Sequence, residues 1–171
     1  MPIRWENRYN IFMKRLLLVL IIASLLGCAH VISQELRERA DKELSFAGLL
    51  KDPDRHVGRF VILGGIIASS ANTEEGTYIE VVQNPLDFRG RPEYKDVSGG
   101  RFLILYEGYL DSAIYSQGKE VTVAGEVTGK RVRPLGEMQY TYPLIKSREI
   151  HLFTPSYGIP IHFGIGIFKT F

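Results

Sequence analysis

The stretch RFVILGGIIAS, residues 59–69, decides the fold class of this 171-residue chain. It consists almost entirely of β-branched, aromatic and other apolar residues, which favour a β-strand. Two adjacent glycines, Gly64 and Gly65, interrupt it. Because paired glycines inside a strand mark a bulge or a sharp bend, we predict that this first strand curls.

Four more strands follow the first one along the chain. They are predicted at residues 77–83 (TYIEVVQ), 101–106 (RFLILY), 119–128 (KEVTVAGEVT) and 140–153 (YTYPLIKSREIHLF). A helical turn at residues 110–115 separates the third strand from the fourth. This order matches an OB-fold, a small and partly open five-stranded barrel, whereas a β-sandwich would need more strands at closer spacing. We therefore predict a mainly β protein whose OB-fold-like barrel occupies residues 59–153.

Two long connections interrupt the predicted barrel. Residues 84–100 (NPLDFRGRPEYKDVSGG) are rich in proline, glycine and charge and form the longest predicted loop. Residues 130–139 (KRVRPLGEMQ) are interpreted as a second loop, between the last two strands. Pro143 then restricts the fifth strand to a sheet edge or a bulge, because proline has no backbone N–H to donate.

The fourth strand shows which side of the sheet meets the core. Its valines at 121, 123 and 127 share one face, because side chains alternate along a strand. The opposite face carries Thr122, Glu126 and Thr128. We therefore expect one face of this strand to be buried and the other to contact water.

Helical character is confined to residues 28–58, before the barrel. Ser33 and Ser45 are candidate N-caps, and we predict one or two short helices that end before Pro53.

The other end of the chain, residues 154–171, is an apolar tail. Apolar side chains occupy every second position from Ile159 to Ile167, so an extended tail would present one strongly apolar face. Two interpretations stay open. The tail packs on the barrel or on an open sheet edge as additional core, or it docks on the membrane or on a partner strand.

An export signal precedes all of these elements. Lys14 and Arg15 lead into eleven residues, 16–26, that contain nothing more polar than a serine. This length fits the roughly 7–15-residue apolar core of a secretory signal peptide and is shorter than the ~20 residues that a membrane-spanning helix needs. We therefore predict a signal peptide over residues 1–27, for which Met13 would be the more typical start.

The end of this signal, residues 25–28 (LLGC), resembles the bacterial lipobox. In the lipobox the cysteine thiol receives a diacylglycerol, the bond before the cysteine is cut, and the new amino group is acylated. Cys28 is the single cysteine of the chain, so no internal disulfide can form in the oxidising compartment beyond the membrane. Lipidation of Cys28 accounts for this otherwise isolated thiol.

Removal of the signal changes the charge balance. Residues 1–27 hold four of the 21 basic and one of the 19 acidic side chains, so the remaining chain carries a net charge of about −1 rather than +2. The excess of positive charge therefore belongs to the signal and does not indicate nucleic-acid binding. We expect no nucleic-acid partner.

Eight short motifs follow the lipobox along the chain. They are GRFVILGGII (58–67), EVVQNPLD (80–87), RP (91–92), GRF (100–102), VTVAG (121–125), GE (136–137), YTYP (140–143) and HL (151–152). Together with the lipobox, this series resembles the Slp family of outer-membrane lipoproteins over residues 28–153.

The resemblance implies a starvation- or stress-associated lipoprotein anchored in the outer membrane. It supplies no catalytic residues, and no cofactor beyond the covalent diacylglycerol and N-acyl chain at Cys28. Ala29, rather than an aspartate, follows the cysteine. By the sorting rule that the resemblance brings with it, we expect transfer to the outer membrane, with the domain facing the periplasm. We expect a non-enzymatic structural or interaction protein of the envelope.

Candidate ligand-binding residues gather around the predicted loop between the last two strands. Lys130, Arg131 and Arg133 lie in it, and Tyr140 and Tyr142 follow closely. OB-folds bind oligonucleotides and oligosaccharides through this loop. In an exported protein, the same cations and rings would suit lipopolysaccharide phosphates, glycans or another envelope protein.

Signals for catalysis and for metal binding are weak in this sequence. No two of the four histidines have metal-ligand spacing, and no nucleophile elbow, HExxH motif or phosphate loop occurs. Asp87, Glu93 and Asp96 lie in the long loop and offer a carboxylate pair for glycoside chemistry. We expect neither a metal nor a catalytic residue, and keep a small envelope enzyme or a glycan- or lipopolysaccharide-binding module as alternatives.

Overall fold

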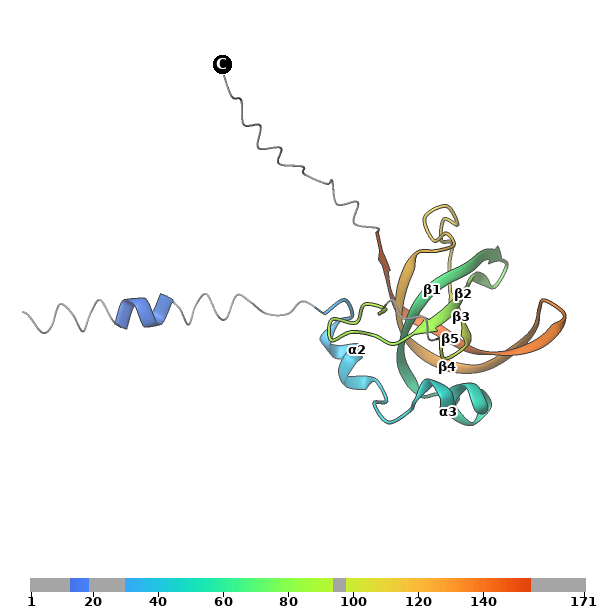
Figure 1. The fold of residues 1–171 in the computed structure, drawn as a ribbon, viewed down its shortest axis with the longest axis horizontal. Coiled ribbons are helices and arrows are strands. Elements are labelled where there is room, and N and C mark those ends of the chain that lie inside the picture. Colours follow the sequence, from blue (N-terminus) through green and yellow to red (C-terminus); the bar gives the residue numbers. More distant parts are fainter. Residues whose placement is uncertain (1–12, 19–29, 94–97, 155–171) are drawn as a thin grey trace, which may run out of the picture.

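Five strands close into a barrel, and two short helices and a 3-10 turn lead directly into it (Figure 1). A further helical segment, not expected from the sequence, lies at residues 13–18. The computed structural model describes residues 13–18, 30–93 and 98–154 of the chain. The elements are α2 (Gln34–Arg39), α3 (Phe46–Lys51), η1 (Pro53–His56), β1 (Phe60–Thr73), β2 (Gly76–Asn84), β3 (Arg101–Tyr106), β4 (Glu120–Leu135) and β5 (Met138–Phe153). The strand order is β1-β2-β3-β5-β4, with β3 and β5 parallel and all other neighbours antiparallel. The predicted mainly β, five-stranded barrel is confirmed. Cys28 and the tail from residue 155 onward lie outside the described residues.

β1 closes the barrel because it pairs with two strands. Its first part pairs with β4 and its second part with β2, and the two pairings overlap at Gly64, Gly65 and Ile66. A Cβ on Gly65 would lie 1.9 Å from the carbonyl oxygen of Val82, so only glycine allows β1 and β2 to approach this closely. The predicted curl is confirmed, and the β-bulge of this strand lies just past the glycines, after Ile67.

β4 differs from the prediction on its outer face. Val121, Val123 and Val127 are fully buried in the barrel core, as expected. Thr122, expected to contact water, is fully buried as well. Its hydroxyl donates to the carbonyl oxygen of Gly90 at 2.7 Å, because the loop after β2 folds across this part of the sheet.

That loop, residues 85–93, is held in shape by its own side chain and backbone. The Asp87 carboxylate accepts the backbone N–H groups of Arg89 and Arg91, each at 2.8 Å. An isolated bridge joins Leu86 to Pro92. A segment that the sequence marks only as irregular is therefore a folded cover over β4.

The prediction of a loop at residues 130–139 is wrong. β4 continues to Leu135 and β5 begins at Met138, so the two strands form one long hairpin. Only Gly136 and Glu137 lie between them, and Gly136 has a φ of 62°. Two-residue hairpin turns require positive φ, which glycine adopts without strain. The charges of this segment are therefore carried by strands and not by a loop.

Pro143 occupies the kind of position that its chemistry requires. It pairs with Lys130, beside a register shift of β4 between Val127 and Gly129. β3 pairs with β5 only from Leu144 onward, so Pro143 lies just outside that ladder. The prediction that Pro143 lies at a sheet edge or a bulge is therefore confirmed by its edge position.

The short helical elements also follow the sequence signals. The side chain of Ser45 caps α3, whereas Ser33 occupies the N-cap of α2 without a side-chain hydrogen bond. Pro53 opens η1 directly after α3. The predicted turn between β3 and β4 is a single one, in which the N–H of Tyr115 donates to the carbonyl of Asp111 at 2.9 Å. Within the described ranges, no helix has the length and apolar character needed to cross a membrane.

Candidate binding face on the barrel

The structure brings together four of the five residues that the sequence marks for ligand binding. Arg131 pairs with Tyr142 and Arg133 with Tyr140 across the β4–β5 hairpin, and directly paired residues share a face. Lys130 alternates to the opposite face, where its Nζ lies 2.6 Å from an aspartate carboxylate of η1. The candidate site therefore excludes Lys130.

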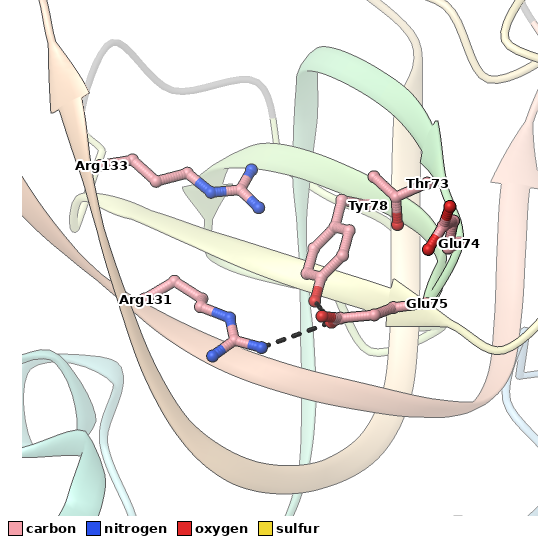
Figure 2. A pocket seen from close by; sticks show the side chains of 6 residues that line it. All are labelled: Thr73, Glu74, Glu75, Tyr78, Arg131 and Arg133. Atoms are coloured by element: carbon pink, nitrogen blue, oxygen red, sulfur yellow. Dashed lines mark hydrogen bonds and ion pairs between the residues drawn. The ribbon is translucent and has the colours of Figure 1, made fainter.

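The two arginines border a small open pocket on the outside of the barrel (Figure 2). The turn between β1 and β2 forms the facing wall, and β2 supplies a tyrosine between the two. The pocket has a volume of about 500 Å³ and is lined by Thr73, Glu74, Glu75, Tyr78, Arg131 and Arg133. We call this surface the binding face.

Contacts between the two walls organise the binding face. The Tyr78 hydroxyl donates to the Glu75 carboxylate. Arg131 Nη2 lies 3.4 Å from the same Glu75 oxygen (Figure 2). The guanidinium carbon of Arg133 lies 4.8 Å from the centroid of the Tyr78 ring, in cation–π geometry. The turn, β2 and the hairpin are therefore joined by one polar network.

The ionisation of Glu75 reflects this network. The hydrogen bond from Tyr78, followed by the nearby charge of Arg131, lowers the pKa of the Glu75 carboxyl. The Tyr78 hydroxyl and Glu75 in turn raise the pKa of Arg131. Both groups are therefore charged at neutral pH. The face offers two acidic and two basic side chains and is electrically balanced.

Tyr140 and Tyr142 of the hairpin pack beneath the side chains of the binding face and hold the strands in place. Tyr142 is buried, and its hydroxyl donates to Glu80 at 3.3 Å, while Glu80 also pairs with Arg101. Burial is the first cause that raises the pKa of Tyr142. The Tyr140 hydroxyl accepts the N–H of Arg101 at 2.9 Å, and its ring lies 4.7 Å from the Tyr142 ring. These two rings are fixed in the structure, and Tyr78, only 4% exposed and covered by Arg133, is buried as well. The accessible side chains of the pocket are therefore polar ones, most of them charged.

Sequence reasoning missed Glu75 and Tyr78. OB-folds use two connections, one between the first two strands and one between the last two. The sequence shows the second through its basic residues, whereas Glu75 looks like ordinary turn material and Tyr78 like one more strand residue. The rule that OB-folds also use the connection between the first two strands would have pointed to the turn before Gly76.

Of the three loop carboxylates that the sequence offers for glycoside chemistry, Asp96 lies outside the described residues. The Asp87 carboxylate serves the backbone of its own loop, and the hydrogen bond from the N–H of Arg91 is the first cause that lowers its pKa. Glycoside hydrolysis needs a general acid with a raised pKa, so Asp87 lacks that property. In the portion of the chain that the structure describes, no group of three or more histidine, cysteine, aspartate or glutamate residues could hold a metal ion.

We expect the Glu75 carboxyl to titrate below the ordinary glutamate value, and a Tyr78→Phe variant to move its midpoint upward. A lowered folded pKa means that the stabilisation is present above the unfolded pKa and is lost as pH falls through the folded pKa. The variant therefore also loses part of the acid dependence of stability. Carboxyl NMR titration measures the midpoint. Tyr140→Phe is the control, because the bond of Tyr140 goes to Arg101; an unchanged Glu75 midpoint in Tyr78→Phe would contradict the assignment.

Comparison with known proteins supplies the family. Residues 25–161 match the model of the "Outer membrane lipoprotein Slp family". The chain therefore belongs to this family of outer-membrane lipoproteins, and the resemblance carried by the sequence motifs is confirmed.

Two curated relatives are similar to this chain. The "Uncharacterized lipoprotein YeaY" of Escherichia coli (strain K12) is 26% identical over 120 residues, which cover 70% of this chain and 62% of that protein. An "Uncharacterized protein" of Haemophilus influenzae (strain ATCC 51907 / DSM 11121 / KW20 / Rd) is 27% identical over 97 residues, covering 56% of this chain and 52% of that protein. The chain thus spans less than two thirds of either relative.

Among solved structures, the small single-stranded DNA-binding protein from Streptomyces coelicolor aligns with 56% of this chain and 94% of its own. The TM-score is 0.35 and the sequence identity 14%.

Proposed function

We propose that this chain is a lipid-anchored interaction protein of the outer membrane, acylated at Cys28, whose barrel faces the periplasm and acts without catalysis. Family membership supports the anchor, and the matched region begins at residue 25, inside the lipobox. Through the same family resemblance, we propose that the protein serves the envelope under starvation or stress.

The observation that carries the interaction role is the geometry of the binding face. Arg131 is exposed on the hairpin, and Arg133 stacks on Tyr78. Glu75, in the turn between β1 and β2, forms an ion pair with Arg131. These two connections are the ones through which OB-folds bind their ligands. An electrically balanced pocket that exposes both signs suits a surface carrying both signs, which is typical of another protein.

The non-catalytic part of the proposal rests on how the polar groups are used. Glu75, Glu80 and Asp87 each accept hydrogen bonds from neighbouring protein groups. Such carboxylates stabilise the turn, the sheet and the loop in which they lie. The pKa values of Glu75 and Asp87 are lowered by these hydrogen bonds, whereas a general acid at neutral pH needs a raised pKa.

A charge reversal on the hairpin tests the interaction role. Arg131→Glu places a negative charge beside Glu75, so we expect loss of the envelope proteins that crosslink to the chain in intact cells. Lys130→Glu is the matched control, because Lys130 is the adjacent residue on the opposite face of the same strand. Equal thermal melting of the two variants would show that both fold. Crosslinks that persist in Arg131→Glu, or that disappear equally in Lys130→Glu, would contradict the proposal.

A glycan- or lipopolysaccharide-binding module is the second candidate, and one observation favours it. Phosphate groups pair with guanidinium groups, and Arg131 and Arg133 both line the pocket. Titrating the protein with glycan fragments or lipid A phosphates would then shift NMR signals of the binding face. Turnover of a glycan fragment would instead favour a small envelope enzyme.

A further inference from the structure

We infer that the end of the barrel formed by residues 30–32 and the loop at 86–90 rests on the bilayer surface, with Phe88 among the phospholipid headgroups. We call this surface the anchor end. The inference rests on the proposed acylation of Cys28. It adds a protein–lipid contact to the covalent anchor and thereby fixes which way the barrel points.

Covalent geometry places the anchor end close to the lipid. His30 is the second residue after Cys28, and two residues reach at most ~7 Å. The folded domain begins directly after His30, because Ile32 is buried with only 1% of its surface exposed. An acyl chain on Cys28 therefore holds His30 and its neighbours within a few ångströms of the membrane.

The loop at 86–90 is packed against this entry point. The N–H of Val31 donates to the carbonyl of Arg89 at 3.0 Å. Gly90 is so close to the His30 ring that a Cβ on it would lie 2.6 Å from the ring carbon Cε1. Whatever brings His30 to the membrane brings this loop to it as well.

The loop presents an aromatic ring and a cation to the outside. Phe88 is 73% exposed, and the guanidinium carbon of Arg89 lies 5.2 Å from its ring centroid. A single exposed apolar side chain is ordinary on a protein surface. Phe88 indicates a lipid contact because it lies beside the anchor. An aromatic ring suits the headgroup boundary of a bilayer, and the neighbouring arginine can reach the lipid phosphates.

The loop is also firm enough to hold the ring there. The Asp87 carboxylate accepts two backbone N–H groups of the loop, and the buried Thr122 hydroxyl donates to the Gly90 carbonyl. Phe88 therefore projects from an ordered turn that is attached to β4. Inserting it into the headgroup region requires little additional ordering of the chain.

The opposite end of the molecule then points away from the membrane. Figure 1 shows α2 and the loop at 86–90 at one end and the β4–β5 hairpin reaching out at the other. Met138, which opens β5 at the hairpin tip, is 71% exposed and provides a matched position far from the anchor. The anchor end contacts lipid, and the hairpin with its binding face extends toward other envelope components.

Tryptophan fluorescence tests this orientation. The only tryptophan of the chain, Trp5, lies in the segment removed with the signal, so Phe88→Trp and Met138→Trp each give a single reporter. Both positions are exposed, and equal thermal melting confirms that both variants fold. The acylated protein is purified from membranes and reconstituted into vesicles that contain brominated phosphatidylglycerol and phosphatidylethanolamine.

We expect the tryptophan at position 88 to be quenched several-fold more strongly than the one at 138, and its emission to shift to the blue. Intact mass and vesicle flotation of the same samples report the anchor separately. An acylated, floating protein in which both reporters are quenched equally or not at all overturns the lipid contact alone. A protein without acyl chains overturns the anchor, and the lipid contact with it.

Discussion

A Cys28→Ser variant is expected to disappear from the outer-membrane fraction while keeping the fold of the barrel. Each buried methylene of an acyl chain contributes about 0.8 kcal/mol, and several chains together give stable anchoring. The variant has no thiol to receive them. The barrel is unaffected because the core begins at Ile32, four residues further on.

Membrane fractionation and thermal melting of the released protein measure both parts of this result. Ala29→Ser is the control, since it changes the neighbouring residue and retains the cysteine. Cys28→Ser protein that still sediments with the outer membrane would show that another element holds it there. Because the contact inferred for Phe88 involves a single exposed ring, it is too weak to retain the protein by itself.

The second large effect is expected from Gly65→Ala. The added Cβ would lie 1.9 Å from the Val82 carbonyl oxygen and 2.8 Å from the Val82 carbonyl carbon. Both are backbone atoms, so β1 and β2 must move apart at the point where β1 passes from one neighbour to the other. We expect a loss of about 3 kcal/mol or more in the free energy of unfolding, the upper range for an overpacked site.

Denaturant unfolding measures this loss, and Gly48→Ala is the matched control. Gly48 lies in α3, and its nearest neighbours are the flexible side chains of Ser45 and Leu44, at 3.3 and 3.8 Å from an added Cβ. Alanine is the better helix former by about 1 kcal/mol, so a small change is expected there. Equal unfolding free energies for the two variants would contradict the role assigned to the Gly64–Gly65 pair.

The sequence predicts the barrel well because its strongest signals are local. The Gly64–Gly65 pair within a β-rich run indicates a curled strand, and the structure uses these glycines where β1 changes partners. Val121, Val123 and Val127 of β4 occupy one face of the strand, as alternation predicts, and all three are buried in the core. The alternation of side chains and the placement of glycines both reflect local backbone geometry, so they can be read from neighbouring residues in the sequence.

Long-range packing accounts for the errors. Thr122 has the chemistry of a surface residue, and its burial depends on a loop about thirty residues earlier in the chain. The basic residues at 130–133 resemble a loop by composition, yet pairing with β5 makes them a strand. In the binding face, Glu75 and Tyr78 become recognisable as site residues only through their contacts with Arg131 and Arg133. These arginines are more than fifty residues away in the sequence, so no local pattern predicts the contacts.

The mass of the mature N-terminus tests most directly whether this family member is anchored by lipid. Protein extracted from outer membranes is digested, and the N-terminal peptide is analysed by mass spectrometry. We expect a peptide that begins at Cys28 and carries a diacylglycerol on the thiol and a third acyl chain on the amino group. An unmodified Cys28, or a mature chain that begins at another residue, would contradict this expectation.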